Sequence, residues 1–369
     1  MKQCLNSECG IRNAEFRCVY GAASLNSAFR IPNSEFVAIM RIAVLGSPRS
    51  WYLQDLRRAA GQRYEIVSCT FGQIAAGLGA GSTKLGIRNA EFGMRNEGRG
   101  GSSSSSEFRT PHSALDREWF TSGDVALADF DCLLVRTMPP GSLEQVVFRM
   151  NALARLEAAG TLVVNPPKAI EAAVDKYLTL AKLQTAGLNI PRTVVCQTPE
   201  DAMTAFAQLG GDVVLKPLFG AEGRGIARLT DEAMALRAFK LLAELRAVIY
   251  LQEYIPHEGF DYRILMIGDR ALAMRRRNPL DWRTNVARGA KAEPCELTHE
   301  LRDLASRAAA AVEAPLAGVD LLPGRGGAIY AIEVNAVPGW RAMAKALGVD
   351  VAAMVLECLQ KAFKSGSFV

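Results

Sequence analysis

Histidine is scarce in this chain: only three occur among 369 residues, at positions 112, 257 and 299. Three histidines therefore argue against both a histidine-rich metal centre and a Ser-His-Asp triad. The sequence also lacks an apolar run of about 18 residues, which excludes a hydrophobic membrane span. Its N-terminal stretch has no apolar core of the kind that a secretory signal contains. We therefore expect a cytoplasmic protein with no membrane partner.

Paired cysteines are lacking as well, since none of the eight cysteines forms a C-x-x-C motif. Five of them are scattered through apolar segments, which is typical of reduced thiols in a core. The net charge of +5 is mild and does not by itself call for nucleic acid. The length suggests about two or three domains, and the 49% hydrophobic content is ordinary for a soluble enzyme.

A short repeat interrupts the ordinary sequence. The heptapeptide GIRNAEF occurs at residues 10–16 and again at 86–92, and the second copy leads to a Gly/Ser tract. Because these blocks lack apolar periodicity, we predict a disordered low-complexity tail at 1–39 and a low-complexity insertion at 81–113, both dispensable. The alternative is a cap that binds the acceptor. Met40 directly precedes the first expected strand and is a candidate for the start of the natural protein.

Residues 40–165 alternate between strand and helix patterns. Apolar strands are expected at 40–47, 64–71, 131–137 and 161–167, with amphipathic helices at 50–61 and 142–160. This alternation predicts a parallel sheet with crossover helices.

Residues 166–365 have a different pattern. A helix is expected at 168–186, ended by Gly187, and hairpin-like strand pairs follow it. A glycine-rich flap is expected at about 216–225, and a final helix closes the chain. The second half is therefore predicted to be a mixed α+β domain.

The strongest candidate site consists of Asp320, Glu333 and Asn335. Glu333 and Asn335 are two residues apart on an expected strand, so they point to one face. The PGRGG turn can bring Asp320 of the neighbouring strand beside them. Two carboxylates and an amide oxygen suit magnesium that also holds phosphates. The alternative is a polar, solvent-facing sheet surface, but the flanking residues are apolar.

Lys216 precedes the flap, where glycines allow backbone amides to approach phosphate oxygens. These glycines are Gly220, Gly223 and Gly225. No helix follows them, so the pattern is neither a Walker motif nor a dinucleotide-binding turn. An ordinary hairpin loop remains an alternative. Lys176 lies near a helix start and, taken alone, reads as a solvated lysine.

Six arginines fall within nineteen residues: Arg270, Arg275, Arg276, Arg277, Arg283 and Arg288. A nucleic-acid groove would need interleaved aromatic residues, and only Trp282 is present. Guanidinium groups on a strand and its following loop better suit a triphosphate and a carboxylate. We choose Arg276 as the residue that binds a substrate carboxylate. A solvated face is the alternative.

These segments occur together in the order that is typical of one superfamily. AVDKYLTLAKLQTAGLNIPRT, VVLKPLFGAEGRGIARL, LQEYIPHEGFDYRILMIGDRALAMRRR, DWRTNVARGA and LAGVDLL…AIYAIEVNAVPGW resemble the ATP-grasp superfamily, in its RimK-like branch of amino-acid ligases. The likeness covers about residues 161–362 and is weaker over 40–80 and 114–160. It implies α/β and α+β architecture: an ATP-grasp fold at 166–365 behind an N-terminal parallel-sheet domain at 40–165.

The resemblance also implies residue roles. The expected nucleotide ligands are Lys176 and Lys216 at the phosphates, Glu253 and Tyr254 at the adenine, Asp261 near the ribose, and the flap glycines. The expected residues around the transferred phosphoryl group are Arg283, Asn285 and Arg288. Asp320, Glu333 and Asn335 match the magnesium ligands. Ala287 stands where some members carry histidine.

The function implied is an ATP-dependent ligase that forms an amide through an acyl-phosphate. We expect glutamate as the amino acid and a carboxylated acceptor, either a pterin-type coenzyme or a protein tail. ATP is required with one or two Mg²⁺ ions, for which Mn²⁺ can substitute, and a homo-oligomer is left open. Alternatives are a LysX-like ligase acting on an amino-group-carrier protein, which DWRTNVARGA favours, a non-catalytic nucleotide-binding module, and a nucleic-acid-binding protein.

Overall fold

The computed structural model describes residues 39–78, 118–220 and 223–368. Apart from Ile39, the predicted low-complexity blocks at 1–39 and 81–113 lie outside these residues. All described residues belong to one compact unit, Ala38–Val369. None of the helices in this part of the chain is long and apolar enough to cross a membrane.

The first sheet has four parallel strands in the order β2-β1-β6-β7. Its strands are β1 (Met40–Leu45), β2 (Tyr64–Cys69), β6 (Cys132–Val135) and β7 (Leu162–Val164). Two crossover helices belong to it, α1 (Trp51–Ala60) and α2 (Leu143–Ala158). Ser50 caps α1, and Ser142 with Gln145 forms a capping box on α2. The predicted parallel sheet and its crossover helices are confirmed.

A small antiparallel sheet flanks the segment 79–117 and was not predicted. It consists of β3 (Ile74–Leu78), β4 (Glu118–Ser122) and β5 (Val125–Ala126), with 3₁₀ turns η1 (Phe71–Gln73) and η3 (Leu127–Asp129) beside it. The ring of Trp119 lies over Gly77, where an added Cβ would come within 2.2 Å of it. Only glycine fits at this crossing.

The single helix predicted at 168–186 is wrong. The segment forms α3 (Pro167–Val174) and α4 (Lys176–Thr185). Asp175 adopts an extended conformation between them, and its carboxylate accepts hydrogen bonds from the amides of Tyr177 and Leu178. The helix breaks because this side chain caps α4, and Lys176 becomes the first residue of the new helix.

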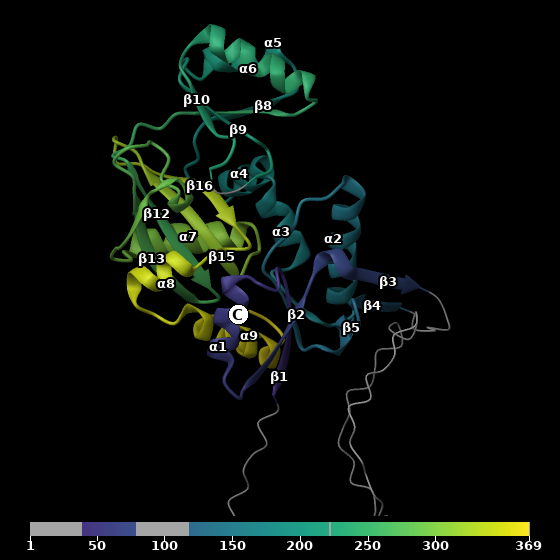
Figure 1. Cartoon of the computed structure of the whole chain (residues 1–369). Coiled ribbons are helices and arrows are strands. Elements are labelled where there is room, and N and C mark those ends of the chain that lie inside the picture. The colour runs from purple at the N-terminus through teal and green to yellow at the C-terminus, as the bar shows by residue number, and fades with distance from the viewer. Residues whose placement is uncertain (1–38, 79–117, 221–222, 369) are drawn as a thin grey trace, which may run out of the picture. The chain divides into compact units, whose positions relative to one another are not determined.

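Two further sheets carry the second half of the chain (Figure 1). The four-stranded sheet has the order β10-β9-β11-β8, and the five-stranded sheet has the order β14-β13-β12-β15-β16. The strands of the first are β8 (Thr193–Cys196), β9 (Val213–Lys216), β10 (Ala227–Leu229) and β11 (Ile249–Glu253). Those of the second are β12 (Phe260–Ile267), β13 (Arg270–Arg277), β14 (Lys291–Pro294), β15 (Leu316–Pro323) and β16 (Ile329–Asn335). The predicted strand pairs are thus antiparallel neighbours.

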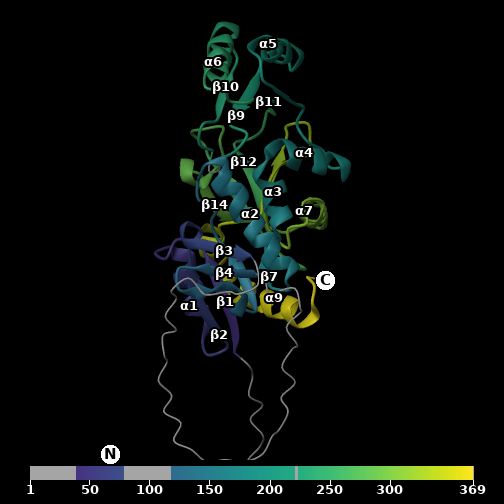
Figure 2. The same cartoon turned by 90° about the vertical axis from the view of Figure 1, so that its right-hand side faces the viewer.

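Helices cover both of these sheets. They are α5 (Pro199–Gln208), α6 (Glu232–Glu244), α7 (His299–Ala311), α8 (Arg341–Leu347) and α9 (Val351–Ser365). The first two pack on the four-stranded sheet through Phe206 and Phe239. Helix α7 lies beside α4 (Figure 2) and packs on β12 and β15.

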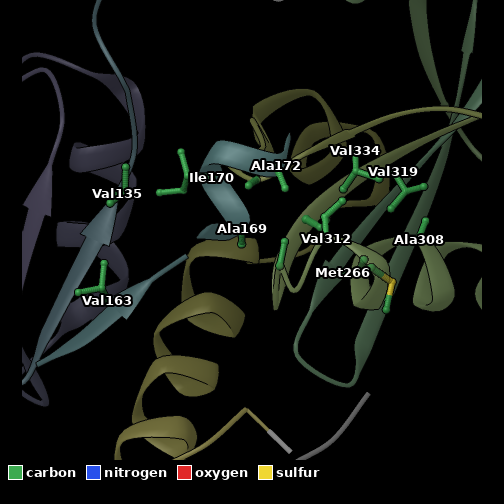
Figure 3. Packing of buried hydrophobic residues seen from close by; sticks show 14 of the residues in the cluster. Val135, Val163, Ala169, Ile170, Ala172, Met266, Ala308, Val312, Val319 and Val334 are labelled. Carbon is green, nitrogen blue, oxygen red and sulfur yellow. The ribbon is translucent and has the colours of Figure 1, made fainter. Parts of the chain in front are cut away.

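A continuous apolar core joins the first sheet to the five-stranded sheet (Figure 3). It runs from Val135 and Val163 through Ile170 of α3 to Val319 and Val334. Val319 and Val334 are paired on β15 and β16 next to the candidate metal ligands. The core therefore fixes the strands that carry the site.

Candidate active site

The three predicted metal ligands are brought together as the sequence suggested. Asp320 of β15 pairs directly with Glu333 of β16, and Asn335 pairs with Gly318 two positions along. Burial and the facing Asp320 both raise the pKa of Glu333. Its carboxylate accepts no hydrogen bond from the described residues, while Asn335 Oδ1 accepts one from the amide of Val337 at 2.8 Å. Two opposed carboxylates with an amide oxygen on the same face suit Mg²⁺, so this donor set fits the ion that the fold implies.

A row of buried charges extends from these ligands across the sheet. Arg263 Nη1 donates to Asp320 Oδ1 at 2.5 Å, and Arg276 Nη2 lies 2.9 Å from Asp320 Oδ2. The strand register explains the contact, because β12 pairs Arg263 with Asp320. Burial opposes the ionisation of Asp320, but the two guanidinium groups outweigh it and hold its pKa below the ordinary value. Asp320 is therefore a fixed carboxylate anion.

Arg276 is enclosed in this row. Its Nε and Nη2 donate to the two oxygens of Asp261 at 2.8 and 2.5 Å, and only 6% of the residue is exposed. Thr284 Oγ1 also donates to Asp261, at 2.6 Å. Contact of Arg276 with a substrate carboxylate and of Asp261 with a ribose stay predictions. In the structure each of these side chains is already bound to a charged group of the chain.

The two predicted nucleotide lysines both lie within electrostatic reach of Glu333. Lys216 ends β9, and its Nζ donates to Gln252 Oε1 at 2.5 Å. Burial lowers the pKa of Lys216 to about 8, although Glu333 partly offsets this effect. Lys176 Nζ donates to the carbonyl oxygens of Leu218 and Gly220 at 3.2 and 2.8 Å. Burial also lowers the pKa of Lys176, again against the attraction of Glu333.

The end of the flap contacts the segment that carries the predicted phosphoryl residues. Arg288 Nη2 donates to the carbonyl oxygen of Gly223 at 3.1 Å. A Cβ on Gly223 would lie 2.5 Å from Asn285 Oδ1, and φ at Gly223 is +70°, so both space and backbone require glycine there. Arg283 Nη2 instead pairs with Asp281 at 2.6 Å. Asn285 and Arg288 thus lie against the flap, while Arg283 is held by a neighbour.

The predicted adenine hinge is held by its own neighbours. The carboxylate of Glu253 accepts hydrogen bonds from Arg192 N and Nε at 2.8 and 2.6 Å. The Arg228 guanidinium lies 3.5 Å from the ring centroid of Tyr254. The amides of Glu253 and Tyr254 donate to the carbonyl oxygens of Arg192 and Asp212, the residues just before β8 and β9. Any contribution of this segment to adenine would therefore come from its carbonyl groups and its aromatic face.

Comparison with known proteins assigns this arrangement to a family. The RimK-like ATP-grasp domain matches residues 173–359. The chain belongs to the RimK-like ATP-grasp family. It is therefore an ATP-grasp ligase, an enzyme that forms carbon–nitrogen bonds, and ligases of this family use ATP and Mg²⁺.

Several relatives of this ATP-grasp ligase have named activities. The tetrahydromethanopterin:alpha-L-glutamate ligase of Methanosarcina acetivorans is 34% identical over 270 residues, which cover 65% of this chain and 83% of that protein. A probable alpha-L-glutamate ligase of Xanthomonas campestris pv. campestris is 35% identical over 217 residues, or 58% of this chain and 74% of the other.

Solved structures agree on the fold. A RimK domain ATP-grasp protein from Sphaerobacter thermophilus superimposes with a TM-score of 0.61 at 21% identity, over 86% of this chain and 98% of that one. The ATP-grasp ligase PsnB, in complex with a minimal precursor, Mg and ADP, gives a TM-score of 0.60 at 22% identity, over 87% and 97%. The predicted ATP-grasp fold is thereby confirmed.

Sequence reasoning missed Arg263 and Thr284. Arg263 lies two residues after Asp261 on the same strand face, so the strand alternation that located Glu333 and Asn335 could have found it. Thr284 gave no such signal, because its contact with Asp261 depends on how the loop after β13 returns to the sheet.

Proposed function

We propose that this ligase joins the amino group of glutamate to a carboxylate of a pterin-type coenzyme through an acyl-phosphate. The chemical part of this proposal rests on the paired Asp320 and Glu333 of β15 and β16, with Lys216 at the end of β9 and Lys176 at the start of α4 both attracted to Glu333. The relatives that act as glutamate ligases on tetrahydromethanopterin support the substrates. We further propose that one or two Mg²⁺ ions bind with ATP, that Mn²⁺ can replace them, and that the protein is cytoplasmic. Whether it forms a homo-oligomer is a question for a measurement of its mass in solution.

The first step transfers the γ-phosphoryl group of ATP. An oxygen of the acceptor carboxylate attacks the γ-phosphorus, and the bond to the β–γ bridging oxygen breaks with its electron pair leaving on ADP. Lys176 and Lys216 reduce the negative charge of the triphosphate, and Arg288 lies at the flap where it can brace the transferred group. Asp320, Glu333 and Asn335 would hold Mg²⁺, which supplies charge neutralisation to the phosphates when bound.

The second step forms the amide. The glutamate amine attacks the acyl carbon, the tetrahedral oxyanion collapses, and phosphate leaves with the electron pair of the broken carbon–oxygen bond. The amine releases its protons to solvent. No nucleophilic side chain is required, because positioning and charge stabilisation supply the catalysis. The scarcity of histidine agrees with such a mechanism.

The buried charge row gives Arg263 and Arg276 a positioning role in this proposal. Each guanidinium holds an oxygen of Asp320, and Arg276 also holds Asp261. With both arginines in place, Asp320 remains ionised and fixed in one orientation, as a metal ligand needs. This role replaces direct contact between Arg276 and the substrate as the function that its surroundings support best.

An ADP-release screen tests the proposal. The enzyme is supplied with ATP and Mg²⁺, and single amino acids are combined with tetrahydromethanopterin or with a small acidic carrier protein. We expect ADP only when glutamate and tetrahydromethanopterin are both present. Release that requires the carrier protein would favour the LysX-like alternative. ATP binding without ADP release under any combination would favour a non-catalytic module.

A further inference from the structure

One arginine outside the proposed machinery is buried at the edge of the first sheet. Arg136 directly follows β6, and its amide donates to the Leu45 carbonyl at the end of β1 at 2.8 Å. The chain passes from β1 to β2 on one side and to β6 on the other, so this is the point where the strand order reverses. In open parallel sheets, ligands bind in the crevice outside the carboxyl ends of the strands at such a point.

The Arg136 guanidinium has donors left over. Only 7% of the residue is exposed, and Nη2 donates to the carbonyl oxygen of Pro338 at 2.7 Å. The neighbouring rings of Trp340 and Tyr52 lie against it, with centroids 4.2 and 4.9 Å from Cζ. Nε and Nη1 are buried and have no hydrogen-bond partner within the described residues. Buried donors are nearly always satisfied, so these two need a partner.

The charge of this group is also uncompensated. Burial lowers the pKa of Arg136 to about 10, which leaves it protonated at neutral pH. The one acid of α1, Asp55, is already bound: Trp340 Nε1 donates to one of its oxygens at 3.0 Å and Arg58 to the other at 2.8 Å. A buried cation without a counter-ion is costly, and an anion is the partner that relieves it.

The surroundings favour an anion as well. Helix α1 begins beside the guanidinium with Tyr52 in its first turn, and this turn contains no acidic residue. Helix N-termini attract negative charge. Exposed Arg49 lies in the loop before α1, and Arg341 lies over the ring of Trp51, 5.4 Å from its centroid. Two further guanidinium groups therefore lie near the start of α1.

Arg136 is linked to the strand that carries the predicted metal ligands. Pro338, which accepts from its Nη2, is three residues after Asn335, and three residues span at most about 11 Å. The loop between them is fixed by the hydrogen bond from Val337 N to Asn335 Oδ1. A carboxylate held at this guanidinium would lie beside the loop that follows Asn335, one of the predicted metal ligands. The nucleotide lysines belong to β9 and α4, so ATP does not need Arg136.

We propose that Arg136 binds a carboxylate of the acceptor through Nε and Nη1, at the switch point of the first sheet. The proposal rests on the proposed ligase function and adds to it the residue that recognises the acceptor. The acceptor is favoured over glutamate because its carboxylate must be presented to the phosphoryl group, whereas glutamate reacts through its amine.

Direct binding tests this without turnover. Calorimetry would measure the affinities of wild-type enzyme, Arg136→Met and Arg136→Lys for tetrahydromethanopterin, glutamate and AMPPNP, with Mg²⁺ present. Arg149→Met is the matched control, because Arg149 is also 7% exposed and also donates to a backbone carbonyl, that of Pro139 at 2.9 Å, but has no unsatisfied buried donor. We expect Arg136→Met to weaken acceptor binding by about 10- to 100-fold, the loss typical of charge-assisted hydrogen bonds. Arg136→Lys should retain part of the acceptor affinity that Arg136→Met loses. Glutamate and AMPPNP affinities should be unchanged.

Each other outcome is decisive. Unchanged acceptor affinity in Arg136→Met, an equal loss in Arg149→Met, or a loss confined to glutamate would overturn the proposal. If Arg136→Met does not fold, Arg136→Lys carries the comparison by itself. If wild-type enzyme does not bind tetrahydromethanopterin, the proposed acceptor is wrong, and glutarate is then titrated as a simple carboxylate probe. Glutarate binding that Arg136→Lys weakens would support Arg136 as the carboxylate site, and absence of binding would overturn it.

Discussion

Replacing Lys216 with methionine should separate the effect of this lysine on folding from its effect on nucleotide binding. Burial moves its pKa from 10.5 to about 8. At 1.36 kcal/mol for each pH unit, that difference corresponds to about 3 kcal/mol against the charged form. Because the side chain is only partly buried, we expect about 1–3 kcal/mol in practice.

The sign of the pH dependence follows from where the proton is lost. Below about pH 8, Lys216 is protonated in both the folded and the unfolded chain. The full cost of burying its charged ammonium group therefore lowers the stability of the fold. Between about pH 8 and 10.5, the folded chain loses the proton first, and the penalty disappears as pH rises. The stability of Lys216→Met relative to wild type should therefore fall by about 1–3 kcal/mol between about pH 7 and 10.

Urea unfolding without nucleotide, at several pH values over this range, measures the difference. Thiol and phenol titrations occur in both proteins and cancel. Lys364→Met, at an exposed lysine of α9, is the control and should show no such trend. AMPPNP affinity at neutral pH should drop about 10- to 100-fold in Lys216→Met only. A pH-independent stability difference would refute the burial argument, and unchanged AMPPNP affinity would refute the nucleotide role.

Four further substitutions test the rest of the site. Glu333→Gln should lower ADP formation at least about 100-fold with an unchanged melting temperature. Asp320→Ala should also destabilise the fold by about 3–5 kcal/mol, because it leaves the buried Arg263 without its acid partner and removes one of the two acid partners of Arg276. Equal stability of the two variants would contradict the charge row. Gly223→Ala should reduce turnover, because its Cβ would meet Asn285 Oδ1, and normal turnover would show that the flap does not need this contact. Asp175→Ala should cost about 1 kcal/mol through the lost helix cap and weaken nucleotide binding through Lys176; denaturation and AMPPNP titration would detect both, and full retention of both would refute the capping argument.

The pairing of the predicted metal ligands could be predicted from sequence because strand geometry is local. A two-residue spacing puts Glu333 and Asn335 on one face, and a short turn returns the chain so that Asp320 faces them. The same reasoning could have paired Asp261 with Arg276, since β12 and β13 are joined by the two-residue turn Gly268–Asp269. Counting outward from that turn places Arg276 opposite Asp261 and predicts an ion pair between them.

Other features depend on contacts between distant segments. The environment of Arg136 depends on Trp340 and Pro338, which the fold alone brings to it. The break at Asp175 was missed because apolar periodicity continues from α3 into α4, and only the side-chain cap distinguishes two helices from one. The β3–β4 pairing joins strands separated by residues 79–117, so no local turn announces it.

The acyl-phosphate is the central claim, and the fate of the acceptor oxygen tests it most directly. The acceptor carboxylate is labelled with heavy oxygen and incubated with the enzyme, ATP, Mg²⁺ and glutamate, and the products are analysed by mass spectrometry. Transfer through an acyl-phosphate predicts one labelled oxygen in each inorganic phosphate and one glutamyl residue added for each ADP formed. Amide product with unlabelled phosphate would contradict the account.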